Sequence, residues 1–300
     1  MRAKPLVSVI MRSRNSDWII AQAIGALYSQ TFKDFELIVV DSNSKDRTLE
    51  IIQEFPVKLI MIKSSEYYPG TILNMAIKEA KGKILVFQNS DAVPVNQFAL
   101  EKLITPFENP EIQATFARQI PRPDAALWVQ REYKTSFPDT DETPSWISLS
   151  LPMAAMRKSA WKERHFYADA WGSEDSEWGH WAKQNGKKIK YVKDAQIMHS
   201  HNYSLRQLYG RKFIEGEADA FIYRDKYSII KAFKHFLGAV KNDLFFYLKK
   251  QCFLGIFMIP IRRFVQFFSF YKAHKFGEKR IKTGNKNRSK GQKEVLSRYE

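Results

Sequence analysis

The sequence predicts an α/β protein with a mostly parallel β-sheet, flanked by helices and followed by a helical, basic C-terminal extension. Short apolar runs alternate with segments of helical periodicity through the first 90 residues. The runs are apolar at nearly every position, which is typical of strands buried on both faces of a parallel sheet. Polar residues follow each run directly, and ligands of such sheets bind at the carboxyl ends of the strands.

The first third of the chain contains the clearest elements. Strands are expected over residues 7–11, 35–40, 58–62 and 84–87, where β-branched and other apolar residues dominate. Helices are expected over residues 21–29, 48–55 and 72–80, with Asp46 as the cap of the second helix. Polar stretches follow the four strands at residues 12–15, 41–44, 64–66 and 88–91. We expect these stretches to converge on one edge of the sheet.

The alternation is less regular after Pro94. A helix over 98–107 and a strand over 113–117 precede a Pro- and Asp-rich connection over 121–144, with a short helix near 127–132. Helices over 159–164 and 174–185 follow, then an edge strand over 189–192, and the chain is helical from Ser204. This pattern predicts a first domain over residues 1–204, with halves of about 1–95 and 96–204, a helical extension over 205–275, and a basic, disordered tail over 276–300.

Charge and cysteine content limit the function classes. The single cysteine, Cys252, excludes an intrachain disulfide and fits a reducing compartment. The net charge is +16, and residues 272–300 hold ten Lys or Arg against three Glu. Such a tail is typical of contact with nucleic acid or with an anionic membrane. Because no nucleic-acid-binding motif is present, nucleic acid is the disfavoured partner.

One apolar stretch predicts contact with a membrane surface. Residues 252–261 are apolar and are flanked by Lys249–Lys250 and Arg262–Arg263, a pattern typical of an interfacial helix. No window of eighteen residues is both apolar and uncharged, so no membrane span is expected. The apolar stretch near the N-terminus is too short for a signal peptide and is interrupted by Arg12. We therefore expect a cytoplasmic protein, peripheral on the inner face of the plasma membrane.

Two carboxylates, Asp41 and Asp91, each end a predicted buried strand. Neither is followed by the Gly-rich turn that cradles phosphates in many nucleotide-binding proteins. The charge of a diphosphate would then be neutralised most simply by a divalent metal held by a carboxylate. Asp91 is the candidate ligand, with Asn89 offering a neutral oxygen on the same side of the strand. Asp41 would contact a base or a ribose.

Three segments carry a resemblance to a known family. They read V-S-V-I-M-R-S-R-N, F-E-L-I-V-V-D-S-N-S-K-D-R-T and P-G-T-I-L-N-M-A-I-K-E-A-K-G-K-I-L-V-F-Q-N-S-D-A. They resemble family-2 nucleotide-sugar glycosyltransferases, and the resemblance runs from about residue 5 to residue 204. It implies a GT-A type fold with a Rossmann-like sheet. The segments Q-N-S-D-A-V-P, A-R-Q-I-P-R-P-D-A and H-S-H-N-Y-S-L are most similar to the bacterial rhamnosyltransferase-like branch.

The resemblance implies a binding site for a nucleotide diphosphate sugar. Carried over by position, Asp41 contacts the base, Asn74 lines the nucleotide side, and Asp91 binds the diphosphate and a metal, Mn²⁺ or Mg²⁺. The expected donor-site residues are Arg12, Asn15, Asp41, Asn43, Asn74, Asn89, Ser90 and Asp91. Asn89 departs from the family, since many members carry an acidic residue there. Loss of that carboxylate predicts a weaker hold on the metal when the donor is absent.

The segment W-G-S-E-D-S-E-W, residues 171–178, can be interpreted in two ways. Acidic residues in the first turn of a helix stabilise it through the helix dipole, without any catalytic role. The resemblance implies instead that Asp175 is the general base that deprotonates an acceptor hydroxyl. Glu174 would then be the neighbouring carboxylate that acts on Asp175 through like charge.

His199 and His201 alternate in M-H-S-H-N-Y-S, so on a strand both would point to one face and could bind a metal. The resemblance implies that one of them approaches the metal or the diphosphate. Two structural histidines are the other interpretation.

Arg118, Gln119 and Trp171 are the candidate acceptor-binding residues. Arginine suits phosphate, and an indole ring can stack on a sugar. Packing or a solvated surface would explain each of these residues as well.

The predicted function is an inverting transfer of a hexosyl unit, with rhamnosyl as the candidate, from a nucleotide diphosphate sugar. The acceptor would be lipid-linked or a polysaccharide, in the synthesis of a cell-surface glycan such as O-antigen. The alternatives are a non-catalytic homologue, which Asn89 would suit, and a basic nucleic-acid-binding protein. A processive synthase would need membrane spans and a Q-x-x-R-W motif, and this sequence has neither.

Overall fold

The computed structural model describes residues 4–169 and 171–284. Within these residues the chain forms two compact units. The first unit comprises residues 4–125, 132–167 and 175–200, and the second comprises 126–131, the described part of 168–174, and 201–284. The first unit holds the β-sheet, and the second is mainly helical. Of the tail predicted over 276–300, residues 285–300 lie outside the described residues.

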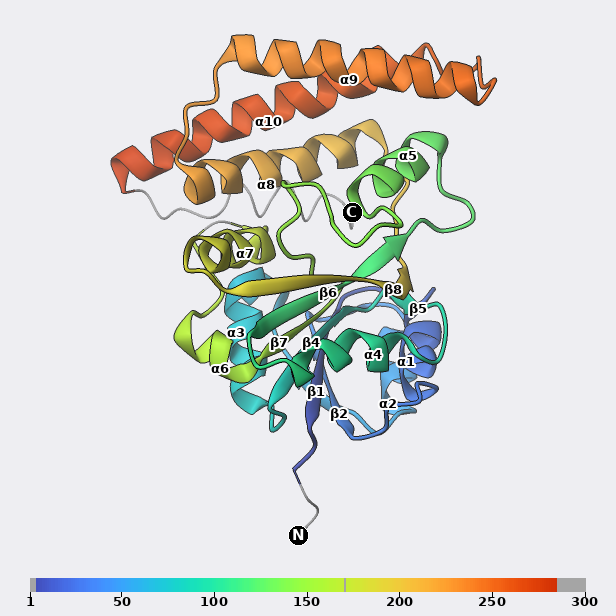
Figure 1. The fold of residues 1–300 in the computed structure, drawn as a ribbon, viewed down its shortest axis with the longest axis vertical. Helices are drawn as coiled ribbons and strands as arrows, with labels where there is room; N and C mark the ends of the chain where they lie inside the picture. The colour runs from blue at the N-terminus through green and yellow to red at the C-terminus, as the bar shows by residue number, and fades with distance from the viewer. Residues whose placement is uncertain (1–3, 170, 285–300) are drawn as a thin grey trace. The chain divides into compact units, whose positions relative to one another are not determined.

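An eight-stranded mixed sheet forms the centre of the first unit (Figure 1), in the order β3-β2-β1-β4-β7-β6-β8-β5. The strands are β1 Val7–Ser13, β2 Phe35–Asp41, β3 Lys58–Met61, β4 Ile84–Asn89, β5 Val93–Pro94, β6 Ile112–Ile120, β7 Met153–Arg157 and β8 Lys188–Met198. The strands β1 to β4 run parallel, as do β6 and β8, whereas β7 is antiparallel to both of its neighbours. The prediction of a mostly parallel sheet is confirmed.

Side chains of the central strands alternate between two apolar cores, one on each face of the sheet. On one face, Ile10 and Phe87 pack with the helices α3 Pro69–Glu79, α6 Lys158–Glu163 and α7 Glu174–Gln184. On the other face, Val9 and Val86 pack with the helices α1 Ile20–Tyr28, α2 Thr48–Gln53 and α4 Ala99–Ile104. Since helices cover both faces, the strand ends are the part of the sheet that remains for a ligand.

Three features of the sheet differ from the predictions. Strand β7 was not predicted, because its sequence M-A-A-M-R contains no β-branched residue, and neither was the two-residue strand β5. Strand β8 is longer than predicted, and its predicted edge position is wrong, because β5 lies outside it. A register shift opposite Ala117–Arg118 interrupts β8 between Val192 and Gln196, which hides the strand's length in the sequence.

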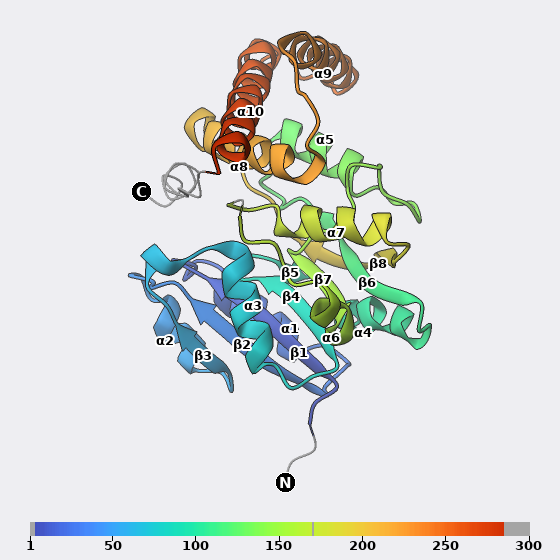
Figure 2. The ribbon, with the colours of Figure 1, turned by 90° about the vertical axis from the view of Figure 1, so that its left-hand side faces the viewer.

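Three long helices form most of the second unit, and α5 Leu127–Ser136 begins in it. They are α8 Leu205–Tyr223, α9 Ile229–Lys249 and α10 Met258–Thr283. Helix α10 lies between α8 and α9 (Figure 2). Ser204 caps α8 by accepting a hydrogen bond from the Gln207 amide at 3.3 Å. Gly216 and Gly277 let α8 and α10 approach closely, because a Cβ at either position would lie within 3.0 Å of a carbonyl oxygen on the facing helix.

Helix α10 continues to Thr283, so the predicted end of the helical extension at residue 275 is too early. Arg280, in the last turn of α10, is buried and forms an ion pair with the buried Glu217 of α8. This pair explains why the basic sequence beyond residue 275 stays helical. Among the residues that the structure describes, no helix is long and apolar enough to cross a membrane.

The predicted lipid-side role of Arg262–Arg263 is wrong, because both side chains are buried, at 6% and 8% exposed. Arg263 donates two hydrogen bonds, at 2.7 and 2.8 Å, to the carboxylate of Asp243 on α9. Nη2 of Arg262 lies 3.7 Å from the same carboxylate, and Arg131 of α5 also pairs with it. Asp243 is fully buried. The arginines therefore tie α10 and α5 to α9 instead of facing solvent or lipid.

Candidate functional site

The ends of β1, β2 and β4 meet at one edge of the sheet, as predicted. In the strand register Arg12 lies opposite Asn89, and Ser13 lies opposite Asp41. Nη2 of Arg12 donates a hydrogen bond to Oδ1 of Asn89 at 3.3 Å. Beyond the strand ends, the hydroxyls of Ser16 and Ser90 are 2.9 Å apart. The edge therefore carries the Arg12 guanidinium and several hydroxyl and amide groups.

The turn after β2 is shaped by the carboxylate of Asp41. Asp41 is fully buried and accepts hydrogen bonds from the amide and the hydroxyl of Ser44, at 2.8 and 2.7 Å. Asn43 and Asn15 both adopt left-handed backbone conformations, with φ of 62° and 45°. The Asn15 side chain accepts a hydrogen bond from the Lys45 amide at 2.9 Å and so joins the turns after β1 and β2. Backbone strain of this kind is common at ligand-binding turns.

Helix α2 begins beside the same turns. The predicted cap, Asp46, is wrong by one residue, because Arg47 holds the N-cap position and makes no side-chain cap bond. Asp46 instead accepts hydrogen bonds from the amides of Thr48 and Asp17 at 3.1 and 3.2 Å. Burial opposes ionisation of Asp46, but hydrogen bonds from Thr48 and Asp17 outweigh it and lower the pKa of the carboxyl below its ordinary value. The charged carboxylate ties the loop after β1 to the start of α2.

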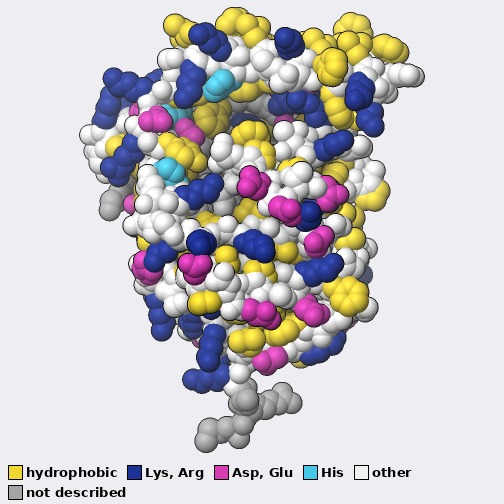
Figure 3. Space-filling model, viewed as in Figure 1, with side chains coloured by type: hydrophobic (Ala, Val, Ile, Leu, Met, Phe, Trp, Pro, Cys, Tyr) yellow, Lys and Arg dark blue, Asp and Glu magenta, His cyan; other side chains and the backbone are white. Residues whose placement is uncertain are grey.

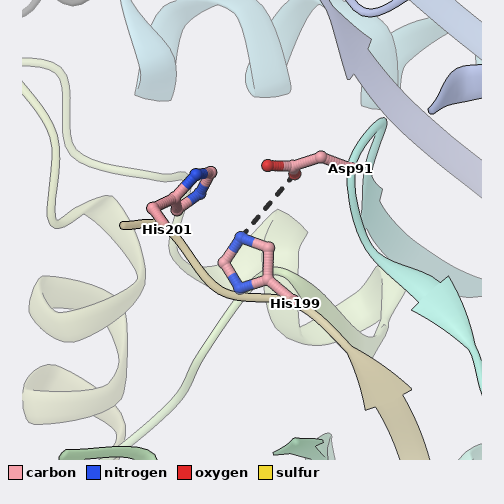
Figure 4. A group of neighbouring side chains, drawn as sticks. All are labelled: Asp91, His199 and His201. Carbon is pink, nitrogen blue, oxygen red and sulfur yellow. Dashed lines mark ion pairs between the residues drawn. The ribbon is translucent and has the colours of Figure 1, made fainter. Parts of the chain in front are cut away.

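Asp91 lies in the turn after β4 and faces His199, which follows β8 (Figure 4). Oδ1 of Asp91 is 3.6 Å from Nε2 of His199. The backbone of the turn is held by Arg122, whose Nη2 donates to the Asp91 carbonyl oxygen at 2.6 Å. The Arg122 amide donates to the hydroxyl of Ser200 at 2.9 Å, and its guanidinium stacks over Trp18. Arg122 therefore fixes the Asp91 turn relative to the segment that carries His199.

The other ring nitrogen of His199, Nδ1, contacts the side chain of Gln119. Nδ1 of His199 lies 2.8 Å from Oε1 of Gln119, and the hydroxyl of Tyr133 is 3.4 Å from the same nitrogen. The Gln119 amide is oriented because its Nε2 donates to the hydroxyl of Ser150 at 2.8 Å. A neutral ring that donates from Nδ1 to this carbonyl oxygen presents the lone pair of Nε2 toward Asp91, as metal binding requires. This arrangement is typical of a metal-binding histidine with its supporting partner.

His201 follows His199 closely in the chain and completes a potential set of metal ligands. One ligand atom each of Asp91, His199 and His201 lies within 4.8 Å of the others. A carboxylate with two imidazoles suits a first-row divalent metal such as Mn²⁺ better than Ca²⁺. Because β8 ends at Met198, the two histidines follow the strand, and strand alternation is not what brings them to one side.

Asp175 lies in the first turn of α7. Its Oδ1 accepts a hydrogen bond from the Ser176 amide at 2.8 Å, and its Oδ2 accepts one from the Leu151 amide at 3.2 Å. The residues before α7 are left-handed, with φ of 104° at Gly172 and 59° at Ser173. Trp178, fully buried, anchors the helix in the first unit's core. The carboxylate is thus held in a fixed orientation at the start of α7.

Several predicted site residues are buried or bonded internally. Glu174 and Trp171 are 6% and 5% exposed, and Gln119 is 3% exposed. Arg118 forms an ion pair with Asp139 at 2.6 Å. Asn74 accepts hydrogen bonds from Trp161 and Phe166 and donates to the Phe166 carbonyl at 2.8 Å, so it ties α3 to the segment after α6. Their predicted contacts with donor or acceptor stay predictions.

The structure adds residues that the sequence did not single out. Ser44 lies within the predicted polar stretch 41–44 but was absent from the expected donor-site residues, and Ser16 directly follows the stretch 12–15. Tyr133 and Ser150 carry no such signal, since they reach His199 and Gln119 across 66 and 31 residues of chain.

Sequence comparisons match this chain to glycosyltransferases. A model of the family "Glycosyl transferase family 2" matches residues 8–170. The chain is 27% identical over 223 residues to the O-antigen chain rhamnosyltransferase RfbN of Salmonella typhimurium, covering 70% of this chain and 71% of that protein. It is 30% identical over 203 residues to the O-antigen chain rhamnosyltransferase WbaN of Salmonella anatum, covering 64% of each.

Solved structures share the fold. The mannosyltransferase PcManGT of Pyrobaculum calidifontis, in complex with GDP-Man and Mn²⁺, superimposes with a TM-score of 0.63 at 16% identity, covering 92% of this chain and 88% of that one. Staphylococcus aureus TarS 1–349, in complex with UDP-GlcNAc, superimposes with a TM-score of 0.54 at 18% identity, covering 94% and 93%. At these identities the likeness concerns the GT-A type fold alone, and it confirms that fold class.

Proposed function

The chain belongs to glycosyl transferase family 2 and is a glycosyltransferase, and from this premise we propose an inverting enzyme that transfers a hexosyl unit. The donor is a nucleotide diphosphate sugar, with rhamnosyl as the candidate sugar. The acceptor is lipid-linked or a polysaccharide, in the synthesis of a cell-surface glycan such as O-antigen. RfbN and WbaN, whose names give O-antigen chain rhamnosyltransferases, support the choice of sugar and of glycan.

The observation that carries the donor site is the convergence of the ends of β1, β2 and β4. Arg12 brings a guanidinium to this edge, and arginine pairs well with phosphate oxygens. The strained turns at Asn15 and Asn43 present backbone and amide groups beside Asp41, where we place the base and ribose. Asn89, Ser90 and Asp91 follow on the neighbouring strand and are placed at the diphosphate and sugar.

The donor set at Asp91, His199 and His201 fits a divalent metal, Mn²⁺ or Mg²⁺, with Mn²⁺ better suited to imidazole ligands. PcManGT contains Mn²⁺ together with its nucleotide sugar, which supports the same pairing here. When bound, the metal would neutralise the charge of the diphosphate and stabilise it as a leaving group. We assign Gln119 to positioning His199 through Nδ1, in place of its predicted contact with the acceptor.

Asp175 is the proposed general base. Its carboxylate accepts the proton of an acceptor hydroxyl while the acceptor oxygen forms a bond to the anomeric carbon. The bond from that carbon to the diphosphate breaks on the opposite face, so the configuration inverts, and the nucleoside diphosphate leaves with the electron pair. Hydrogen bonds from Leu151 and Ser176 hold the carboxylate ready for this role. Glu174 is kept as a neighbouring carboxylate, and Arg118 and Trp171 are kept as candidate acceptor-binding residues.

A peripheral position on the cytoplasmic side of the plasma membrane would bring the enzyme to a lipid-linked acceptor. The exposed apolar side chains of the second unit and the excess of basic residues support this location.

Calorimetric titration with UDP, dTDP and GDP, with and without Mn²⁺ or Mg²⁺, tests the proposal. We expect one nucleotide to bind, and to bind only when metal is present. Asp91→Ala should remove most of the affinity for that nucleotide, and metal should no longer increase what remains. Asp194→Asn changes an exposed acid on β8 outside the site and serves as the control. Binding without metal would mean that Arg12 and the histidines neutralise the diphosphate unaided. Absence of binding by all three nucleotides, in protein shown to be folded, would contradict the donor site.

A further inference from the structure

The second unit exposes an unusual number of large apolar side chains around the connection from α9 to α10. Leu254 is 95% exposed, Phe257 is 81% exposed, and Phe253 is 62% exposed. Phe245 and Leu248 near the end of α9, and Met258, Ile261 and Phe264 at the start of α10, are also exposed. We call these eight residues the apolar tip. Figure 3 shows hydrophobic side chains gathered over this part of the chain, with Lys and Arg among them.

The charge around the apolar tip is of one sign. Between Asp225 and Glu278 the sequence contains a single acidic residue, Asp243, which is fully buried against arginines. The same stretch exposes seven lysines, at positions 226, 231, 234, 241, 249, 250 and 272. Lys249 and Lys250 lie between Leu248 and Phe253 of the tip. The surface therefore combines exposed apolar side chains with positive charge that no exposed acid offsets.

We propose that the apolar tip inserts into the interfacial region of a bilayer that contains anionic lipids, with Lys249 and Lys250 at the level of the lipid phosphates. The inference deepens the proposed function, and rests on it for the peripheral location. An apolar face with basic residues beside it binds membrane surfaces through both the buried apolar area and the attraction of anionic lipid.

The chemistry of the surface argues against two other occupants. In a second copy of this chain, the same lysines would face one another, and like charges across an interface are unfavourable. Nucleic acid would satisfy the lysines but would leave Leu254 and Phe257 without apolar partners. An anionic bilayer satisfies both features at once.

The ion-pair cluster at Asp243 gives the apolar tip a rigid base. Arg263 binds the Asp243 carboxylate through two nitrogens, so α9 and α10 are joined close to the connection between them. The ends of α9 and α10 that carry the tip are thereby held together, and less conformational entropy is lost when the tip enters the bilayer. Lys249 and Lys250, not the buried Arg262–Arg263, supply the charge that contacts lipid.

Vesicle sedimentation with the full chain tests the proposal. The vesicles are made of phosphatidylcholine alone, or of equal parts phosphatidylcholine and phosphatidylglycerol. We expect the wild type to bind the anionic vesicles, and Leu254→Ser/Phe257→Ser to reduce the partition coefficient at least ten-fold. Lys249→Gln/Lys250→Gln should reduce it by about five-fold per lysine at low salt, and by less at high salt. Trp146→Ser, which changes a 60% exposed residue of the first unit, should leave binding unchanged.

All of these positions are exposed, so the variants should fold, and a thermal melt verifies this. If Leu254→Ser/Phe257→Ser binds anionic vesicles as the wild type does, the attraction comes from basic residues elsewhere and the proposal is overturned. A wild-type dimer in light scattering that the same variant converts to monomer, without vesicle binding, would assign the surface to a second copy. Nucleotide titration without vesicles separates the two proposals: nucleotide binding without vesicle binding contradicts only the apolar tip, and the reverse result contradicts only the donor site.

Discussion

Replacing Gln119 by leucine tests whether His199 is positioned as a metal ligand. The change keeps the approximate shape of the side chain and removes the oxygen that lies 2.8 Å from Nδ1 of His199. Nδ1 would keep only the more distant hydroxyl of Tyr133, at 3.4 Å, and a buried N–H without a good acceptor costs up to about 1–3 kcal/mol of folding free energy. Loss of a supporting partner of a metal-binding histidine lowers metal affinity by about 10- to 100-fold, which corresponds to about 1.4–2.7 kcal/mol. The first cost applies with or without metal and lowers the free energy of unfolding, whereas the second concerns metal binding, so we expect a 10- to 100-fold rise in the Kd for Mn²⁺.

The assay is calorimetric titration of Mn²⁺ into protein saturated with the nucleotide that binds the wild type. Gln119→Leu also removes the bond to Ser150, so the free energy of unfolding should fall, and the titration is run well below the melting temperature. Gln113→Leu is the matched control, because Gln113 lies on the same strand and bonds only to the carbonyls of Pro110 and Glu111 in this structure. A folded Gln119→Leu protein that binds Mn²⁺ as tightly as Gln113→Leu would refute the role of Gln119, and with it the assigned tautomer of His199.

Three further changes address the base, the Asp91 turn and the second unit. Asp175→Asn should leave nucleotide binding intact and slow single-turnover sugar transfer by about 10²- to 10⁴-fold, and an unchanged rate would exclude Asp175 as the base. Arg122→Ala removes the bond to the Asp91 carbonyl and should raise the nucleotide Kd in the presence of metal by about ten-fold, measured by calorimetry; an unchanged Kd would mean that the turn is held without it. Asp243→Asn leaves buried arginines without their carboxylate, so the free energy of unfolding measured in a thermal melt should fall by about 3–5 kcal/mol. A loss below about 1 kcal/mol would mean that the ion pairs at Asp243 do not hold α9 and α10 together.

The elements that the sequence predicts well are those whose burial is uniform along a run. Strands β1, β2 and β4 each contain a run that is apolar at nearly every position because helices cover both faces, and that pattern is visible without a structure. Strand β8 alternates exposed lysines with buried residues and contains a register shift, so only its first part has a recognisable pattern. Strand β7 depends on neighbours that are distant in sequence, and its alanines and methionines have no local preference for a strand.

The candidate site divides in the same way. Asp41 and Asp91 could be predicted because a strand end is a local feature, and the carboxyl ends of parallel strands share one edge of a sheet. The bond between Gln119 and His199 joins residues 80 positions apart, and no short-range pattern announces it. Arg262–Arg263 show the limit most clearly. Basic residues beside an apolar stretch look the same whether they face lipid or a buried Asp243, and only the packing of α9 on α10 distinguishes the two.

Asn89 should make the binding of the metal depend on the binding of the donor. The site offers one carboxylate, Asp91, beside two imidazoles, whereas a second acid at position 89 would add a negative charge. With so little negative charge of its own, the site should hold Mn²⁺ weakly until a diphosphate supplies more. By thermodynamic linkage, the nucleotide must then bind more weakly without metal, by the same factor. Asn89→Asp should strengthen Mn²⁺ binding to the nucleotide-free protein and reduce this coupling, although Arg12, which now bonds Asn89, would offset part of the added charge. Equal Mn²⁺ affinity with and without nucleotide in the wild type would show that Asp91 and the histidines suffice to hold the ion, and that Asn89 has no part in the coupling.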